Sequence, residues 1–118
     1  MESHRQNEIQ VLFWNSGKEG SKAEPVKKWI KELDHQSQKQ VDKLIGLIKS
    51  ERRNLGMPYS RHLGSGLHEL RDQRRSGPGY RLYYCWNDDI VVVLLVGGDK
   101  STQTKDIETA KRRMNDEE

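Results

Sequence analysis

The chain has 118 residues, with 21 basic against 18 acidic side chains, and its sequence pI is about 9.0. A chain of this length can enclose one hydrophobic core, so we expect a single domain over residues 1–118, with flexible ends at residues 1–8 and 115–118. The one cysteine, Cys85, excludes an internal disulfide and a cysteine-cluster metal site. No apolar run reaches membrane-spanning length and the chain does not start with a signal-peptide pattern, so we expect a cytoplasmic location.

The first half of the chain has the pattern of one strand followed by two helices. Residues 9–14, IQVLFW, are typical of a short strand, and a polar loop follows them. Pro25 suits the first turn of a helix, and Ser37 with Gln40 forms a capping-box pattern at the start of a second helix. Apolar residues recur at helical spacing in both segments, as Val26, Trp29, Ile30 and Leu33 in the first and Val41, Leu44, Ile45 and Ile48 in the second.

The second half changes to a strand pattern. A loop rich in glycine over residues 54–66 precedes three expected strands, at residues 67–71, 80–86 and 90–96. The last strand is apolar on both faces, which is typical of a central strand. Alternation along the middle strand separates two faces, with Tyr80, Leu82, Tyr84 and Trp86 on one and Arg81, Tyr83 and Cys85 on the other.

A final helix is expected after Gly97 and Gly98, with Asp99 or Ser101 as its cap. We expect the two glycines to let the chain turn and to release Lys100 from the core. The predicted fold is therefore α+β, in the order β-α-α-β-β-β-α. Its small, mostly antiparallel sheet has a helical hairpin on one face and an open basic face on the other. The apolar residues of the final helix are Ile107, Ala110 and Met114.

Positive charge is concentrated between Arg61 and Arg81. This segment contains five arginines and two histidines, but only two acids, Glu69 and Asp72. Such a basic field favours a phosphate-rich ligand, chiefly nucleic acid, although a solvated basic loop has the same composition. The chain has no P-loop, no HExxH motif and no Cys/His metal spacing. A surface of this kind can promote RNA cleavage by stabilising charge, because the 2′-OH is an internal nucleophile, or it can bind nucleic acid passively.

Three motifs resemble the RelE/HigB superfamily of toxins from type II toxin–antitoxin systems. They are PYSRHLGSGLHELR at residues 58–71, GPGYRLYY at 77–84 and GGDKSTQTKDIETAKR at 97–112. The pattern is typical of the phage-related addiction module killer protein branch, over roughly residues 24–114.

This resemblance implies a RelE-like fold and a cytoplasmic toxin that cleaves mRNA on the ribosome. Cleavage would proceed by 2′-OH attack, without a metal or another cofactor. The implied partners are the ribosome, mRNA and a cognate antitoxin, often a helix-turn-helix protein encoded beside the toxin. Operator DNA would be contacted only through the antitoxin complex, and no membrane is involved.

The resemblance also implies roles for single residues. Arg81 matches an arginine that contacts the scissile phosphate, with a plain cross-strand pair as the alternative. Arg71 matches a basic position that binds the RNA backbone, and Glu69 is either a base or the partner of Arg71. The last helix contains no tyrosine, so Tyr83 or His68 is the candidate proton donor. The candidate catalytic residues are Arg81, Arg71, Lys100, His68, Glu69 and Tyr83, and the candidate RNA-binding residues are Arg61, His62, Arg74 and Arg75.

Two other functions are compatible with the same fold. The related ParE-like toxins inhibit DNA gyrase without cutting nucleic acid, and a degenerate copy would retain only antitoxin binding. The first alternative predicts toxicity that does not depend on Arg81. The second predicts that the protein is harmless even without an antitoxin.

Overall fold

The strands form one mixed sheet in the order β1-β5-β4-β3-β2. β1 and β5 are parallel, and every other neighbouring pair is antiparallel. The strands are β1 (Gln10–Phe13), β2 (Ser60–Gly64), β3 (Leu67–Arg71), β4 (Arg81–Trp86) and β5 (Val91–Gly98). Together with the helices this sheet makes an α+β fold, which confirms the predicted class.

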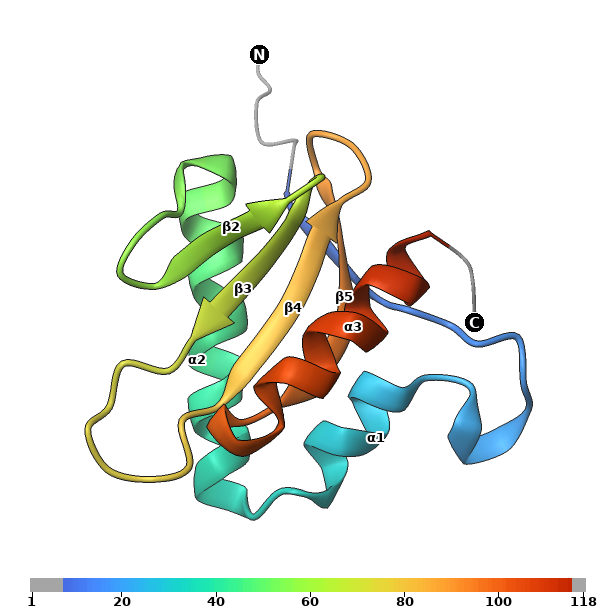
Figure 1. Ribbon diagram of the computed structural model, residues 1–118, viewed down its shortest axis with the longest axis horizontal. Helices are drawn as coiled ribbons and strands as arrows, with labels where there is room; N and C mark the ends of the chain where they lie inside the picture. Colours follow the sequence, from blue (N-terminus) through green and yellow to red (C-terminus); the bar gives the residue numbers. More distant parts are fainter. Residues whose placement is uncertain (1–7, 116–118) are drawn as a thin grey trace.

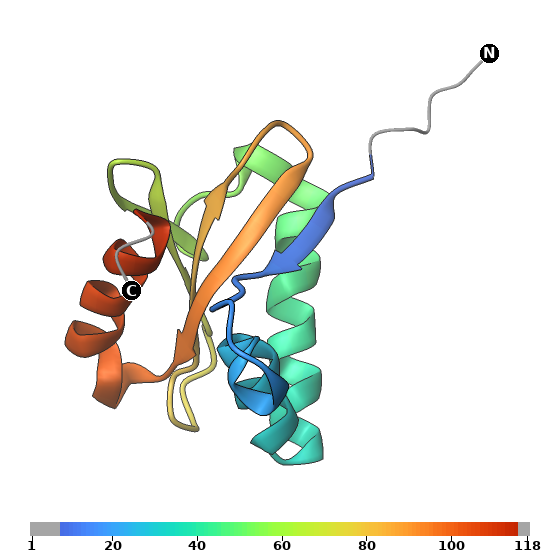
Figure 2. The same cartoon turned by 90° about the vertical axis from the view of Figure 1, so that its right-hand side faces the viewer.

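Helices lie on both faces of the sheet. Figure 2 shows α1 and α2 on one side and α3 on the other. The helices are α1 (Pro25–Glu32), α2 (His35–Glu51) and α3 (Gln103–Met114), with short 3-10 turns η1 (Gly20–Lys22), η2 (Arg52–Asn54) and η3 (Lys100–Thr102). The computed structural model describes residues 8–115, so residues 1–7 and 116–118 of the expected flexible ends lie outside the described part. Within 8–115, no helix is both long and apolar enough to cross a membrane.

A strand that directly follows the helical hairpin, where a loop was predicted, is the main addition to the predicted topology. Residues 60–64 form β2, which pairs with β3 across a turn at Ser65 and Gly66. Both turn residues have positive φ, at 55° and 87°, as a tight hairpin turn requires. The glycines that suggested a loop therefore close a hairpin, and β2 is the edge strand in Figure 1.

The start of α2 differs from the expected capping box. Asp34, not Ser37, is the N-cap, and its carboxylate accepts a hydrogen bond from the Ser37 backbone N–H at 2.7 Å. This bond lowers the pKa of Asp34 below its usual value, because it stabilises the charged form. Ser37 lies inside the first turn, where its hydroxyl accepts a hydrogen bond from the Tyr80 phenol.

The face opposite the helical hairpin is not fully open, in contrast to the prediction. α3 lies there in front of β4 and β5, as Figure 1 shows, and its Ala110 joins buried residues of the sheet in a second cluster. Because β5 is apolar on both faces, each face needs a cover, and α3 supplies the second one. This cluster consists of Leu67, Tyr83, Leu95, Val96 and Ala110, and the hairpin side holds the larger cluster that includes Val41, Leu44, Leu82 and Leu94.

Gly97 and Gly98 do not form the expected turn. Both belong to β5, and neither has positive φ. A Cβ on Gly97 would collide with the indole ring of Trp29, and one on Gly98 would collide with Asp106 and Thr102. The two glycines therefore let α1 approach one face of the strand and the start of α3 approach the other. Asp99 caps the 3-10 turn η3, which leads into the final helix, and its carboxylate accepts from the Ser101 N–H at 2.8 Å. The residue at the N-cap of α3 itself is Thr102, not Asp99 or Ser101 as expected.

Candidate functional site

The arginines of three neighbouring strands meet on the α3 side of the sheet. Antiparallel pairing places Arg61 opposite Glu69 and places Arg71 opposite Arg81. Residues two apart in a strand share a face, so the acid lies next to all three arginines. We call Arg61, Glu69, Arg71 and Arg81 the arginine cluster.

Glu69 is the centre of this cluster. Its side chain is fully buried, and one oxygen, Oε1, lies 3.3 Å from Arg61 Nη2 and 3.7 Å from Arg71 Nε. The other oxygen, Oε2, lies 3.6 Å from Arg81 Nε. A buried carboxylate requires such compensation, since an unpaired charge inside a protein is strongly unfavourable. The geometry therefore supports pairing with Arg71, one of the two roles expected for Glu69.

Two neutral donors complete the surroundings of Glu69. The Tyr83 phenol donates to Oε2 at 3.0 Å, and Gln103 of α3 donates to the same oxygen at 2.7 Å. Burial and the nearby Glu69 charge raise the pKa of Tyr83 well above its usual value, so its proton stays in place. In this arrangement Tyr83 holds the carboxylate, and its proton is already engaged there.

Arg81 is the most enclosed of the three arginines. It is 5% exposed, its Nη1 donates to the Gly79 carbonyl at 2.9 Å, and its Nε is buried without a hydrogen-bond partner among residues 8–115. Arg71 and Arg61 are more accessible, with side chains 32% and 45% exposed. A phosphate approaching from solvent would thus meet these two guanidinium groups first.

Lys100 lies beside Arg81 at the start of η3. A Cβ added to Gly79 would lie 3.3 Å from Arg81 Nη1 and 3.4 Å from Lys100 Cβ, which shows how close the two basic residues come. The Lys100 side chain is exposed, while its backbone N–H donates to the Pro78 carbonyl. The structure therefore brings Lys100 to the arginine cluster.

Asp106 adds an acid to this end of the site. It is half-buried next to Gly98, and burial raises its pKa above the usual value. The Thr102 hydroxyl donates to it, which opposes part of that rise. Sequence reasoning missed both Gln103 and Asp106. Gln103 lies four residues before Ile107 and seven before Ala110, so helical spacing placed it on the sheet-facing side.

His68 and His62 lie on the other face of the sheet. They follow the alternation of β2 and β3. The His68 ring stacks on Tyr84, which belongs to the core under the helical hairpin, and the His62 ring contacts His68. The sheet therefore separates His68 from the arginine cluster. Burial lowers the pKa of His68, and the neighbouring His62 and Arg53 lower it further.

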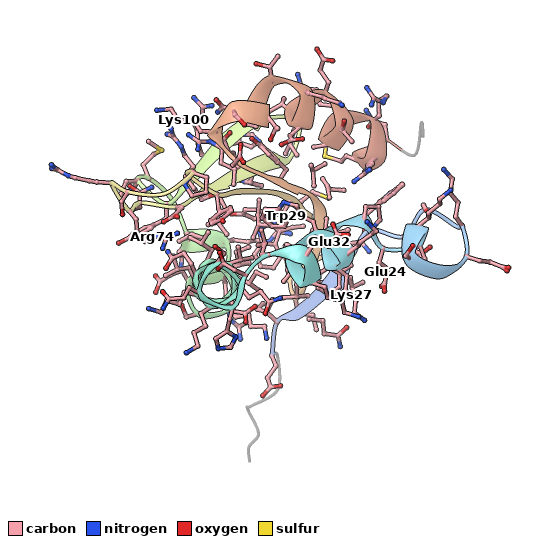
Figure 3. All side chains as sticks on the ribbon, turned by 90° about the horizontal axis from the view of Figure 1, so that it is seen from below. Glu24, Lys27, Trp29, Glu32, Arg74 and Lys100 are labelled. Atoms are coloured by element: carbon pink, nitrogen blue, oxygen red, sulfur yellow. The ribbon has the colours of Figure 1, made fainter. Side chains whose placement is uncertain are left out.

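The remaining candidates, Arg74 and Arg75, lie on the loop between β3 and β4. Arg74 forms a two-pronged pair with Asp72. Its Nε and Nη2 donate to Oδ2 at 3.0 and 2.9 Å, and Nε also donates to Oδ1. These hydrogen bonds raise the pKa of Arg74. Arg75 is exposed. Figure 3 shows Arg74 and Lys100 on the same side of the view, away from Glu24 and Lys27 of the α1 region.

Residues 28–115 match the family of phage-derived Gp49-like proteins (DUF891). The chain belongs to this family. This family is of the RelE-like and addiction-module-killer-like kind. An uncharacterized protein of Haemophilus influenzae is 49% identical over 49 residues, which is 42% of this chain and 48% of that protein. The chain thus matches about half the length of this relative.

Proposed function

We propose that this Gp49-like protein is the toxin of a toxin–antitoxin module and cleaves mRNA on the ribosome. The observation that carries the proposal is the arginine cluster, in which a buried carboxylate holds three guanidinium groups beside exposed Lys100. Guanidinium groups remain charged at any physiological pH and bind phosphate oxygens through a planar pair of donors. A cluster of this kind suits the charge that builds up on a phosphodiester during cleavage.

In the proposed reaction, the 2′-OH of a nucleotide loses its proton to solvent water, and its oxygen bonds to the 3′-phosphorus of the same nucleotide. The bond from phosphorus to the 5′-oxygen of the next nucleotide breaks, and that oxygen takes up a proton. The products are a 2′,3′-cyclic phosphate and a free 5′-OH. Arg71 and Lys100 would contact the phosphate from the exposed side, and Arg81 would stabilise the additional negative charge from below.

Glu69 has an anchoring role in this proposal. Its oxygens already accept from Tyr83 and Gln103 and face three arginines, so they are not available to remove a proton from the 2′-OH. The ribosome would orient the mRNA, which is the step that converts a passive basic surface into a cleavage site. The antitoxin would keep the protein inactive for as long as the two proteins stay bound.

The test is a cleavage assay with mRNA alone and with mRNA on programmed ribosomes, followed by mapping of the 5′ ends. We expect wild-type protein to cut only in the presence of ribosomes. Arg81→Ala and Arg71→Ala should each reduce the cleavage rate by about 100-fold or more, the loss seen when one charge-stabilising donor is removed. Arg71→Ala is included because Arg71 is partly exposed, so its loss disturbs the fold less.

Lys49→Ala serves as the control, since Lys49 is an exposed lysine of α2 away from the cluster. Its cleavage rate should equal that of wild type. Absence of cuts by folded wild-type protein under both conditions would overturn the proposal. That result would favour gyrase inhibition or a module that only binds an antitoxin.

A further inference from the structure

Three aromatic side chains form a row across the strands on the face opposite the arginine cluster. His62 of β2 pairs with His68 of β3, and His68 pairs with Tyr84 of β4. The ring centroids are 4.9 Å apart for the two histidines and 5.1 Å apart for His68 and Tyr84, with interplanar angles of 35° and 19°. We call these three residues the ring row.

The row is anchored at one end and exposed at the other. Tyr84 is 2% exposed and its hydroxyl hydrogen-bonds with Ser60 at 2.6 Å, so the inner ring is fixed in the core. His68 is half-buried, and His62 is exposed on the edge strand. The ring row therefore runs from the core to the surface, where it ends in the exposed ring of His62.

The outer ring is also held in place. The Gly66 backbone N–H donates to His62 Nε2 at 3.2 Å, across the turn that joins β2 and β3. This bond holds the imidazole ring against the β2–β3 turn. An aromatic ring that is already held in place loses little conformational entropy when a flat ligand stacks on it.

Basic side chains lie close to the ring row. The Arg53 guanidinium carbon lies 5.0 Å from the centroid of the Trp86 ring, and its positive charge lowers the pKa of His68. Arg61 precedes His62 in the edge strand and therefore projects to the other face, toward Glu69. An extended chain that crosses the edge at β2 would meet Arg61 with its phosphates and His62 with a base.

We propose that His62 is a stacking site for one base of single-stranded RNA, and that the RNA passes around the β2 edge toward the arginine cluster. The ligand class follows from an exposed flat ring, His62, next to the guanidinium group of Arg61 on the edge strand, since single-stranded nucleic acid is bound by base stacking and backbone charge together. The inference rests on the proposed function only in taking RNA as the substrate.

The test is fluorescence anisotropy with a labelled oligoadenylate of about eight nucleotides, in which 2′-O-methyl groups block cleavage. We expect His62→Ala to weaken binding by about 5- to 150-fold, the range that corresponds to the loss of one base–aromatic stack. His62→Phe keeps a flat ring and should bind within about threefold of wild type. His35→Ala, at an exposed histidine that begins α2, is the matched control and should bind as wild type does.

Any of three results would overturn the inference. His62→Ala could bind as tightly as wild type, His62→Ala and His62→Phe could be weakened equally, or the wild-type protein could fail to bind. A thermal denaturation midpoint equal to that of wild type shows that His62→Ala is folded. The same variants in the ribosome assay separate this inference from the proposed function. If His62→Ala loses oligonucleotide binding but the wild-type protein does not cleave mRNA, the stacking site is supported and the nuclease proposal fails.

Discussion

Glu69 shows how much one side chain can organise. In the sequence it is one of two acids in a basic segment, and in the fold it is the buried counter-charge of three arginines. Arg81 depends on it most, because Arg81 is itself buried and its Nε faces the Glu69 carboxylate without another partner among residues 8–115. Loss of the acid would leave a buried positive charge uncompensated.

We therefore expect Glu69→Ala to reduce the free energy of unfolding by about 3–5 kcal/mol, measured by urea denaturation. Glu24→Ala is the control. Glu24 lies 3.8 Å from Lys27 in an exposed pair, and removal of an exposed pair costs less than about 1 kcal/mol. A loss below about 1 kcal/mol for Glu69→Ala would show that the arginine cluster does not depend on its central acid.

At the level of the elements, the end of β5 determines how the site is assembled. Gly97 lets Trp29 of α1 lie against one face of the strand, and Gly98 admits Asp106 and Thr102 on the other. Gly98 also pairs with Arg81, so the start of α3 is held directly beside the arginine cluster. A larger residue at either position would push a helix away from the sheet.

Gly97→Ala and Gly98→Ala should each lower the free energy of unfolding by about 1–3 kcal/mol, because the new methyl group has no space. Gly46→Ala is a suitable control. Gly46 lies in α2 with nothing within 4 Å of an added Cβ, so this substitution should stabilise the protein by about 0.4–1 kcal/mol. Urea denaturation of the three variants measures the difference. Unchanged stability of the β5 variants would contradict the close approach of α1 and α3.

For the molecule as a whole, the half-buried His68 makes stability depend on pH. Burial, His62 and Arg53 lower the pKa of His68 below its ordinary value of 6.5. As the pH falls through 6.5, the unfolded chain binds a proton that the folded protein resists, so the folded state loses stability.

The free energy of unfolding should therefore decrease from about pH 7.5 to about pH 5.5. His68→Phe retains a ring against Tyr84 but has no group that titrates in this range. Its free energy of unfolding should decrease less over the same interval, as urea denaturation at both pH values would show. An equal decrease in both proteins would mean that His68 is not the group responsible.

The amino-acid sequence alone determined the class of fold, because its signals are local. The helical spacing of Val41, Leu44 and Ile48 and the alternation of Arg81 and Tyr83 with Leu82 and Tyr84 depend only on backbone periodicity, and the structure confirms both. Motif resemblance likewise indicated a toxin-like family of the RelE kind, and it named Arg71, Arg81 and Lys100 as candidate catalytic residues. The structure places them at one end of the sheet.

Only the tertiary structure decided how these residues are used. Strand register placed Glu69 among three arginines and His68 between His62 and Tyr84, and register depends on pairing between distant segments. Likewise, Gly97 and Gly98 have the same sequence signal as a turn, but contacts with Trp29 and Asp106 keep them in a strand. Periodicity along one segment carries no information about its neighbours, so partners, burial and the accessible face had to come from packing.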